Sequence, residues 1–146
     1  MKNILVTVSF EKGDQQLIDK ALQLAEAFGS KVWIVHIAAP DPDFVGYEVG
    51  PQYIRDSRAT DLKKEHHQLQ EFATMFSKKG IKAEGLLVQG ATIEMVIEEA
   101  KKLNADLIIA GHQEHGFIYN ALVGSVSTEI IKKSTIPVLI VPIVKK

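Results

Sequence analysis

Five short apolar segments, separated by stretches of helical periodicity, constrain the fold of this chain more than any other feature. Four of them are nearly continuous in apolar residues, which is typical of strands buried on both faces of a parallel sheet. The third is interrupted by polar residues, which favours an edge strand. The segments are NILVTVSF (3–10), KVWIVHIA (31–38), IKAEGLLVQ (81–89), DLIIAG (106–111) and PVLIVPI (137–143).

Apolar residues recur at helical spacing between these segments, which predicts four helices. Asp14 is the expected N-cap of the first helix and Gly29 its expected end. Gly80 and Asn104 are expected to close the second and third helices. Residues 39–58 hold three prolines and two glycines and are predicted to form a long loop over the sheet. The apolar stripes lie at 17–28, 62–76, 93–103 and 126–131.

Strands that alternate with helices predict an α/β fold with right-handed crossovers and helices on both faces. The predicted architecture is a single domain over residues 1–146, built on one doubly wound five-stranded parallel sheet of order 3-2-1-4-5. Ligands bind such sheets beyond the carboxyl ends of the strands, where the strand order reverses. The reversal falls between the first and fourth strands, which are predicted to end at Ser9 and Gly111. A ligand site is therefore expected there.

Composition excludes several classes of function. The chain has 146 residues, of which 46% are apolar and 24% charged, as in one soluble globular domain. A net charge of -1 gives no general attraction to nucleic acid or to an anionic membrane, and neither is an expected partner. The absence of cysteine excludes disulfides, a thiol nucleophile and thiolate metal sites. No signal peptide or membrane span is recognisable, which predicts a cytoplasmic protein.

The segment GHQEHGFIYNALVGSVST (111–128) joins the fourth strand to the fourth helix. Free backbone N–H groups and the helix dipole favour an anion at a helix start, and Gly124 would let the backbone approach one closely. Ser125 and Ser127 add hydroxyl donors. Because the segment contains no Lys or Arg, main-chain donors would have to hold a phosphate. A turn at Gly124 with Ser125 as a simple N-cap explains the same residues equally well.

The chain resembles the universal stress protein family over essentially its whole length. The family motif G-x2-G-x9-G-[ST], followed by a PVLVV strand, matches Gly111, GSVST at 124–128 and IPVLIVP at 136–142. The start NILVTVSF is similar to the family's ILVPVDGS, and VHIA at 35–38 to its HV strand end.

This resemblance implies a non-catalytic, adenine-nucleotide-binding protein in stress response or signalling, with ATP or AMP as ligand, with or without Mg²⁺. It implies that the loop from Gly111 cradles phosphates, that the backbone of Ile37 meets adenine and that the end of the first strand contacts the nucleoside. It also implies a homodimer through the Val138–Ile143 strand, which an exposed apolar edge strand favours independently. The nucleotide-binding residues are then Val8, Ile37, Gly111, Gly124, Ser125, Val126 and Ser127.

Two departures from the family pattern leave a second function open. Glu114 takes the place of the middle glycine, and Ser9 that of the acidic residue ending the first strand. Similar losses mark the family branch that does not bind ATP, whereas GSVS at 124–127 is intact. The alternative is a dimeric interaction protein that has lost nucleotide binding. The sequence does not identify a signalling partner for either function.

Other signals are weaker. No P-loop or G-x-G-x-x-G occurs, and no general base or magnesium-binding carboxylate is recognisable, so slow ATP hydrolysis is the least favoured function. His66 and His67 would point about 100° apart on a helix and are expected to be solvated or half-buried. His112 and His115 are expected to donate to phosphate oxygens or face water, because they complete no ligand set for a metal.

Overall fold

The computed structural model of the chain describes residues 1–10, 13–38, 52–89, 92–113 and 130–143. Its strands are β1 (Asn3–Thr7), β2 (Lys31–Ala38), β3 (Ala83–Gln89), β4 (Leu107–Gln113) and β5 (Val138–Ile143). Its helices are α1 (Asp14–Phe28), α2 (Gln52–Ser77) and α3 (Thr92–Lys102), and residues 130–133 add a short helical turn.

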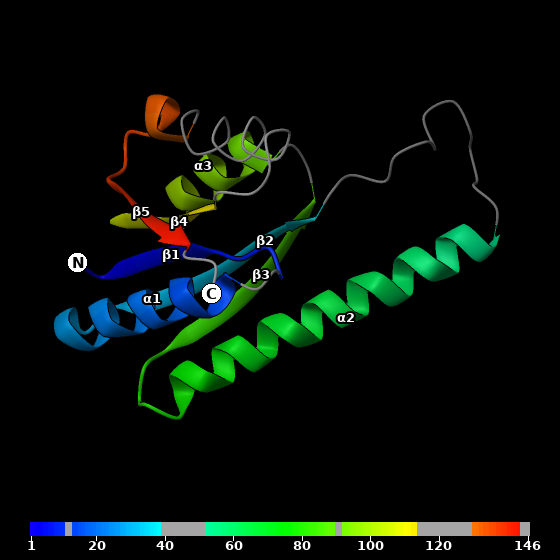
Figure 1. Cartoon of the computed structure of the whole chain (residues 1–146), viewed down its shortest axis with the longest axis horizontal. Helices are drawn as coiled ribbons and strands as arrows, with labels where there is room; N and C mark the ends of the chain where they lie inside the picture. Colours follow the sequence, from blue (N-terminus) through cyan, green and yellow to red (C-terminus); the bar gives the residue numbers. More distant parts are fainter. Residues whose placement is uncertain (11–12, 39–51, 90–91, 114–129, 144–146) are drawn as a thin grey trace.

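The five strands form one parallel sheet of order β3-β2-β1-β4-β5 (Figure 1). This confirms the predicted doubly wound α/β fold and its strand order. The interrupted third segment lies at one edge of the sheet as predicted, and the last strand lies at the other. Central β1 has its three middle residues fully buried, which explains why its sequence is continuously apolar.

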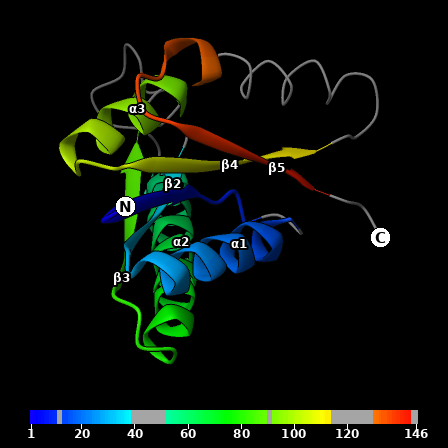
Figure 2. The same ribbon diagram turned by 90° about the vertical axis from the view of Figure 1, so that its left-hand side faces the viewer.

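Helices cover both faces of the sheet, with α1 and α2 on one side and α3 on the other (Figure 2). Ile4 and Val6 of β1 pack in the core beneath α1 and α2, whereas Leu5 packs in the core beneath α3. This alternation follows from the two-residue period of a strand. The right-handed crossovers from β1 to β2 and from β2 to β3 place α1 and α2 on the same face.

The ends of α1 confirm one prediction and correct another. Gly29 adopts the left-handed conformation, with φ of 64°, and its N–H bonds to the carbonyl of Ala25, as predicted for the helix end. Asp14, however, is the first helical residue, and Gly13 occupies the N-cap position without a side-chain bond. Asp14 is absent from the cap because its carboxylate reaches back to the turn that follows β1.

Helix α2 is longer than predicted. It begins at Gln52, so residues 52–58 are helical and the predicted loop over 39–58 is wrong in that part. All three prolines and both glycines of the predicted loop lie at or before Pro51, and the residues after it contain no helix breaker. Figure 1 shows the first part of α2 extending past the end of the sheet.

A glycine sets how closely α2 packs on β3. A Cβ placed on Gly85 would lie 2.8 Å from the Cβ of Leu69, closer than two carbon atoms approach without displacement. None of the helices in the described part of the chain combines the length and apolarity that crossing a membrane needs.

Candidate functional site

The carboxyl ends of β1, β2 and β4 meet at the point where the strand order reverses. In the pairing of β1 with β4, Val6 lies beside Ile109, and the Thr7 hydroxyl donates to the Ile109 carbonyl at 3.3 Å. On the other side, the Val8 N–H donates to the Val35 carbonyl at 3.0 Å. The predicted strand ends are corrected slightly, because β1 stops at Thr7 and β4 continues to Gln113.

Gly111 lies inside β4, in register with Val141 of β5. A Cβ at this position would be 3.3 Å from side-chain carbons of both Ile143 and Leu17. The glycine therefore lets β4 pass close to the first turns of α1 at the carboxyl edge. A larger side chain would have to push apart the groups that border this edge.

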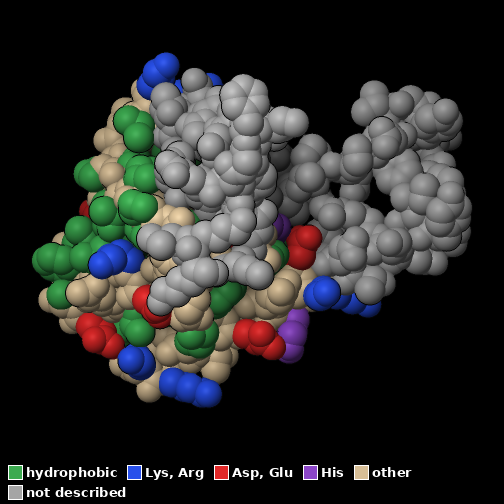
Figure 3. All heavy atoms as spheres, in the orientation of Figure 1, with side chains coloured by type: hydrophobic (Ala, Val, Ile, Leu, Met, Phe, Trp, Pro, Cys, Tyr) green, Lys and Arg blue, Asp and Glu red, His purple; other side chains and the backbone are tan. Residues whose placement is uncertain are grey.

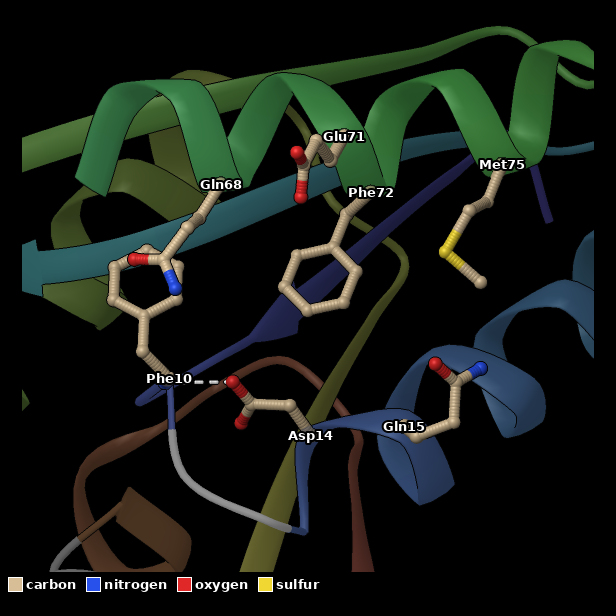
Figure 4. A pocket seen from close by; sticks show the side chains of 7 residues that line it. All are labelled: Phe10, Asp14, Gln15, Gln68, Glu71, Phe72 and Met75. Carbon is tan, nitrogen blue, oxygen red and sulfur yellow. Dashed lines mark hydrogen bonds between the residues drawn. The ribbon is translucent and has the colours of Figure 1, made fainter. Parts of the chain in front are cut away.

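The turn after β1 is held by the buried carboxylate of Asp14. The backbone N–H groups of Ser9 and Phe10 donate to it at 3.0 Å and 2.6 Å, and the Ser9 hydroxyl lies 3.4 Å from it. Figure 4 shows the hydrogen bond from Phe10. Burial raises the pKa of Asp14 above its ordinary value of 3.8, although these hydrogen bonds and nearby His36 act to lower the pKa.

Phe10 adopts a conformation that is uncommon for an aromatic residue. Its φ is 64°, in the left-handed region, where a side chain with a Cβ costs about 1–2 kcal/mol. Two contacts compensate for this cost: the Asp14 carboxylate accepts the Phe10 N–H, and the Phe10 ring lies 4.2 Å from the His36 ring. The turn is therefore strained and fixed by its neighbours.

His36, near the end of β2, connects this turn to α2. Its Nδ1 lies 2.9 Å from the Val8 carbonyl oxygen, and its Nε2 lies 3.6 Å from Oε2 of Glu65 on α2. This Glu65 oxygen is buried and has no hydrogen-bond partner within the described residues. The end of β1 is thus connected through one imidazole ring to a carboxylate on a separate helix.

A cleft of about 410 Å³ opens between α1 and α2 beside the turn (Figure 4). Phe10 and Phe72 give it aromatic walls, and Asp14 is the buried acidic group on its α1 side. Its lining residues are Phe10, Asp14, Gln15, Gln68, Glu71, Phe72 and Met75.

Of the residues predicted to bind nucleotide, the structure brings three to the carboxyl edge. Val8 is buried at the end of β1, Gly111 lies in β4, and Ile37 lies in β2 beside Val88 of β3. Gly124, Ser125, Val126 and Ser127 lie outside the described residues, as do Glu114 and His115, so their roles stay predictions.

His66 and His67 are exposed on α2, which confirms the solvated one of the two expected placements. His67 lies 3.1 Å from Glu71 one turn along the helix, with both side chains largely in solvent. Among the residues that the structure describes, no group of three or more His, Asp or Glu side chains is arranged to hold a metal ion.

Sequence reasoning missed four residues that build this edge, namely Phe10, Asp14, His36 and Glu65. One signal was present, because Phe10 falls on the glycine of the family pattern ILVPVDGS. A glycine in that pattern indicates a backbone position with positive φ, which Phe10 indeed adopts. No local signal connects His36 to Glu65, since 29 positions and an intervening segment separate them.

The sheet order and the three converging strand ends define a doubly wound α/β protein with a candidate ligand site at the point where the strand order reverses. The sequence model of the universal stress protein family matches residues 1–142, and the chain belongs to that family. It is 26% identical over 143 residues to universal stress protein YxiE of Bacillus subtilis, covering 94% of this chain and 97% of that protein.

Solved structures share the fold. A universal stress protein in complex with cAMP is 22% identical, with a TM-score of 0.70 and coverage of 98% of both chains. A universal stress protein family protein of Arabidopsis thaliana with AMP bound is 17% identical, with a TM-score of 0.69, over 97% of this chain and 92% of that one. At these identities the likeness establishes the fold alone.

Proposed function

We propose that this chain is a non-catalytic protein of stress response or signalling that binds AMP or ATP at the carboxyl edge, between β1 and β4. One observation carries the proposal: the strand order reverses at this point and brings Val8 and Gly111 to the same edge. Adenine nucleotides bound to family members of the same fold support the choice of ligand.

Main-chain groups would do most of the binding. The backbone near Val8 and Ile37 would meet the nucleoside, and N–H groups at Gly111 and Gly124–Ser127 would hold the phosphates. A helix start offers free donors and a favourable dipole, so this arrangement needs no lysine. The carboxylate of Glu114 would lie toward the phosphates and would disfavour ATP more than AMP when Mg²⁺ is absent.

The first test asks whether the purified protein carries a nucleotide and binds one. Absorbance of the supernatant after denaturation should show an adenine spectrum, and titration calorimetry should detect AMP binding. Ser125→Pro and Val126→Pro should each weaken binding by about 1–2 kcal/mol per lost hydrogen bond. Ser125→Ala is the matched control, because it keeps the main-chain donor and removes only the hydroxyl. Equal affinity in all four proteins would contradict phosphate binding at this loop.

We propose further that the protein is a homodimer through β5. The strand lies at the sheet edge with Val138, Leu139, Ile140 and Val141 all partly exposed. Hydrophobic side chains gather on the left of Figure 3, over the region that β5 occupies in Figure 1. An apolar edge strand tends to pair with another chain unless something covers it.

Light scattering at micromolar concentration tests this assembly. Ile140→Lys should give a monomer, because a charge at the paired edge would have to be buried. Ile131→Lys is the control, since Ile131 is 58% exposed on the neighbouring helical turn and does not belong to the strand. A wild-type monomer would exclude the dimer, and dissociation by Ile131→Lys alone would place the interface on the helical turn.

A second candidate function is a dimeric interaction protein that has lost nucleotide binding. The turn after β1 favours it, because Ser9 stands in place of an acidic residue and a strained Phe10 in place of a glycine. The same measurements separate the two functions. A dimer without a copurified nucleotide, and without measurable heat on titration with AMP or ATP, would establish the second one.

A further inference from the structure

The contacts of His36 require more hydrogen atoms than a neutral imidazole carries. The Val8 carbonyl can only accept a hydrogen bond, so the Nδ1 atom 2.9 Å away must carry a hydrogen. Neutral histidine then has a lone pair on Nε2, the atom that lies 3.6 Å from Oε2 of Glu65. A lone pair facing a carboxylate is repulsive, whereas an imidazolium donates to the Val8 carbonyl and attracts the carboxylate as an ion pair.

Carboxylates from two helices lie on the side of the sheet that the His36 ring faces. Glu65 approaches from α2, and Asp14 on α1 is close enough for its charge to interact with that of His36. On the β3 side, the residue in register with His36 is Leu87, which carries no charge. The His36 and Glu65 side chains are 13% and 20% exposed, so water screens their interaction only in part.

We propose that His36 is a proton-dependent positioning residue: when protonated, it fastens α2 to the end of β1 and holds the turn that a bound nucleoside would meet. Only the expected effect of His36 on ligand affinity rests on the proposed function. Loss of the proton breaks one of the two contacts, whichever nitrogen keeps its hydrogen. The Val8 carbonyl is two residues from strained Phe10, whose ring lies on the same imidazole, so the change reaches the turn directly.

The first experiment needs no nucleotide. Nuclear magnetic resonance of the ¹⁵N-labelled protein follows the His36 ring nitrogens and the backbone amides of Ser9 and Phe10 between about pH 8 and about pH 5.5, the range in which histidines titrate. Both ring nitrogens should carry hydrogen at the lower pH. The two amide signals should move together with the ring, because its protonation rearranges their turn.

Glu65→Gln is the decisive variant. Its side-chain amide can donate to a neutral Nε2, so the connection from α2 to Val8 would be complete without the proton. The Ser9 and Phe10 amides should then no longer follow the titration of the His36 ring. The matched control is His67→Gln, which removes an exposed His–Glu contact from the same helix and should behave as wild type. Ser9 and Phe10 amides that do not follow His36, or a Glu65→Gln variant that titrates as wild type, would overturn the proposal.

The second experiment measures adenosine affinity by calorimetry at the same two pH values. Adenosine has no phosphate, so protonation of His112 or His115 beside a phosphate cannot contribute. The wild-type protein should bind adenosine about fivefold more tightly at the lower pH, a factor at the lower end of the usual coupling between two sites. The Glu65→Gln variant should bind adenosine with equal affinity at the two pH values. Equal wild-type affinities would refute the effect on the ligand. A protein that binds no adenosine at either pH contradicts the proposed function, and the resonance experiment still decides the role of His36.

Discussion

Two aspartates hold the two ends of β1 with the same kind of hydrogen bonds, and burial gives them opposite acidities. Asp106 accepts the backbone N–H groups of Lys2 and Asn3 at 2.7 Å and 3.0 Å, just where the strand begins. Asp14 accepts those of Ser9 and Phe10 just after the strand ends. Each carboxylate therefore binds two successive main-chain donors at one end of the strand.

The pKa of Asp106 is lowered by the hydrogen bonds from Asn3 and Lys2, because the side chain is exposed and loses little hydration. The pKa of Asp14 is raised because burial disfavours its charge by more than its hydrogen bonds stabilise it. Hydrogen bonding alone therefore does not set the acidity of a carboxylate. The cost of removing water from it can reverse the direction.

The contacts at the two edges of the sheet also differ in their exposure to water. At the amino end, Lys31 lies 2.9 Å from Glu84 and 3.9 Å from the centre of the Trp33 ring, in contacts that water partly screens. At the carboxyl end, Phe10, His36 and Glu65 gather around a strained turn with a buried, unpartnered oxygen. The edge where we propose that a ligand binds therefore combines a strained aromatic residue with a buried carboxylate oxygen that has no hydrogen-bond partner within the described residues.

Asp14→Asn should produce the largest effect in this comparison. An amide has one acceptor where two N–H groups need partners, so its own NH₂ would face a donor in a buried position. The free energy of unfolding in urea at neutral pH should fall by about 1–3 kcal/mol. Asp19→Asn, an exposed change on the same helix, should stay within about 0.5 kcal/mol of wild type. Equal losses in both variants would show that the buried hydrogen bonds are not the cause.

The strain at Phe10 can be measured with two substitutions. Both Phe10→Ala and Phe10→Gly remove the ring contact with His36, but only glycine accepts a φ of 64° without cost. The glycine variant should therefore be more stable than the alanine variant by about 1 kcal/mol in urea denaturation. At exposed Lys20 inside α1 the order should reverse, because alanine is the better helix former. The same order at both positions would argue against strain in the turn.

Asp106→Asn should destabilise the protein less than Asp14→Asn does. Its amide also loses one acceptor, but water can satisfy the N–H group that is left without one, because the site is exposed. Parallel urea titrations of the two variants under one buffer condition provide the measurement. A loss from Asp106→Asn as large as that from Asp14→Asn would mean that burial does not distinguish the two ends of β1.

The smallest expected effect is a difference in pH dependence. A raised pKa means that Asp14 binds its proton more tightly in the folded protein than in the unfolded chain. The wild-type free energy of unfolding should therefore fall, relative to that of Asp14→Asn, as pH rises above about 3.8. A lowered pKa reverses the sign, so the wild-type free energy of unfolding should rise, relative to that of Asp106→Asn, as pH rises toward 3.8. Urea denaturation at several acidic pH values measures both slopes. Slopes of one sign would contradict the opposite acidities.

The sequence was sufficient for much of the fold. Continuous apolar runs predicted buried parallel strands, and the polar interruptions of 81–89 placed that strand at an edge. The structure confirms burial for β1 and the edge position for β3, whereas β5 is partly exposed at the other edge although its run is continuous. The sequence does not mark the start of α2, because the prolines and glycines up to Pro51 favour a loop and no N-cap signal separates them from the helical residues that follow. Asp14 was misjudged as a cap because a local pattern does not reveal a carboxylate that bonds to the residues before it.

By itself, the sequence determined the alternation of strands and helices and the family, because these follow from periodicity and from motifs that are local in the chain. The order of the sheet was predicted only as the common order of doubly wound folds, and the structure confirms it. Only the tertiary structure decided which residues meet at the carboxyl edge. The ring of His36 lies between Val8 and Glu65 because β1, β2 and α2 pack side by side, and no spacing in the sequence encodes a contact made across three elements. The tertiary structure also decided which carboxylates are buried, because burial depends on the whole fold. Burial raises the pKa of Asp14, whereas the pKa of exposed Asp106 is lowered.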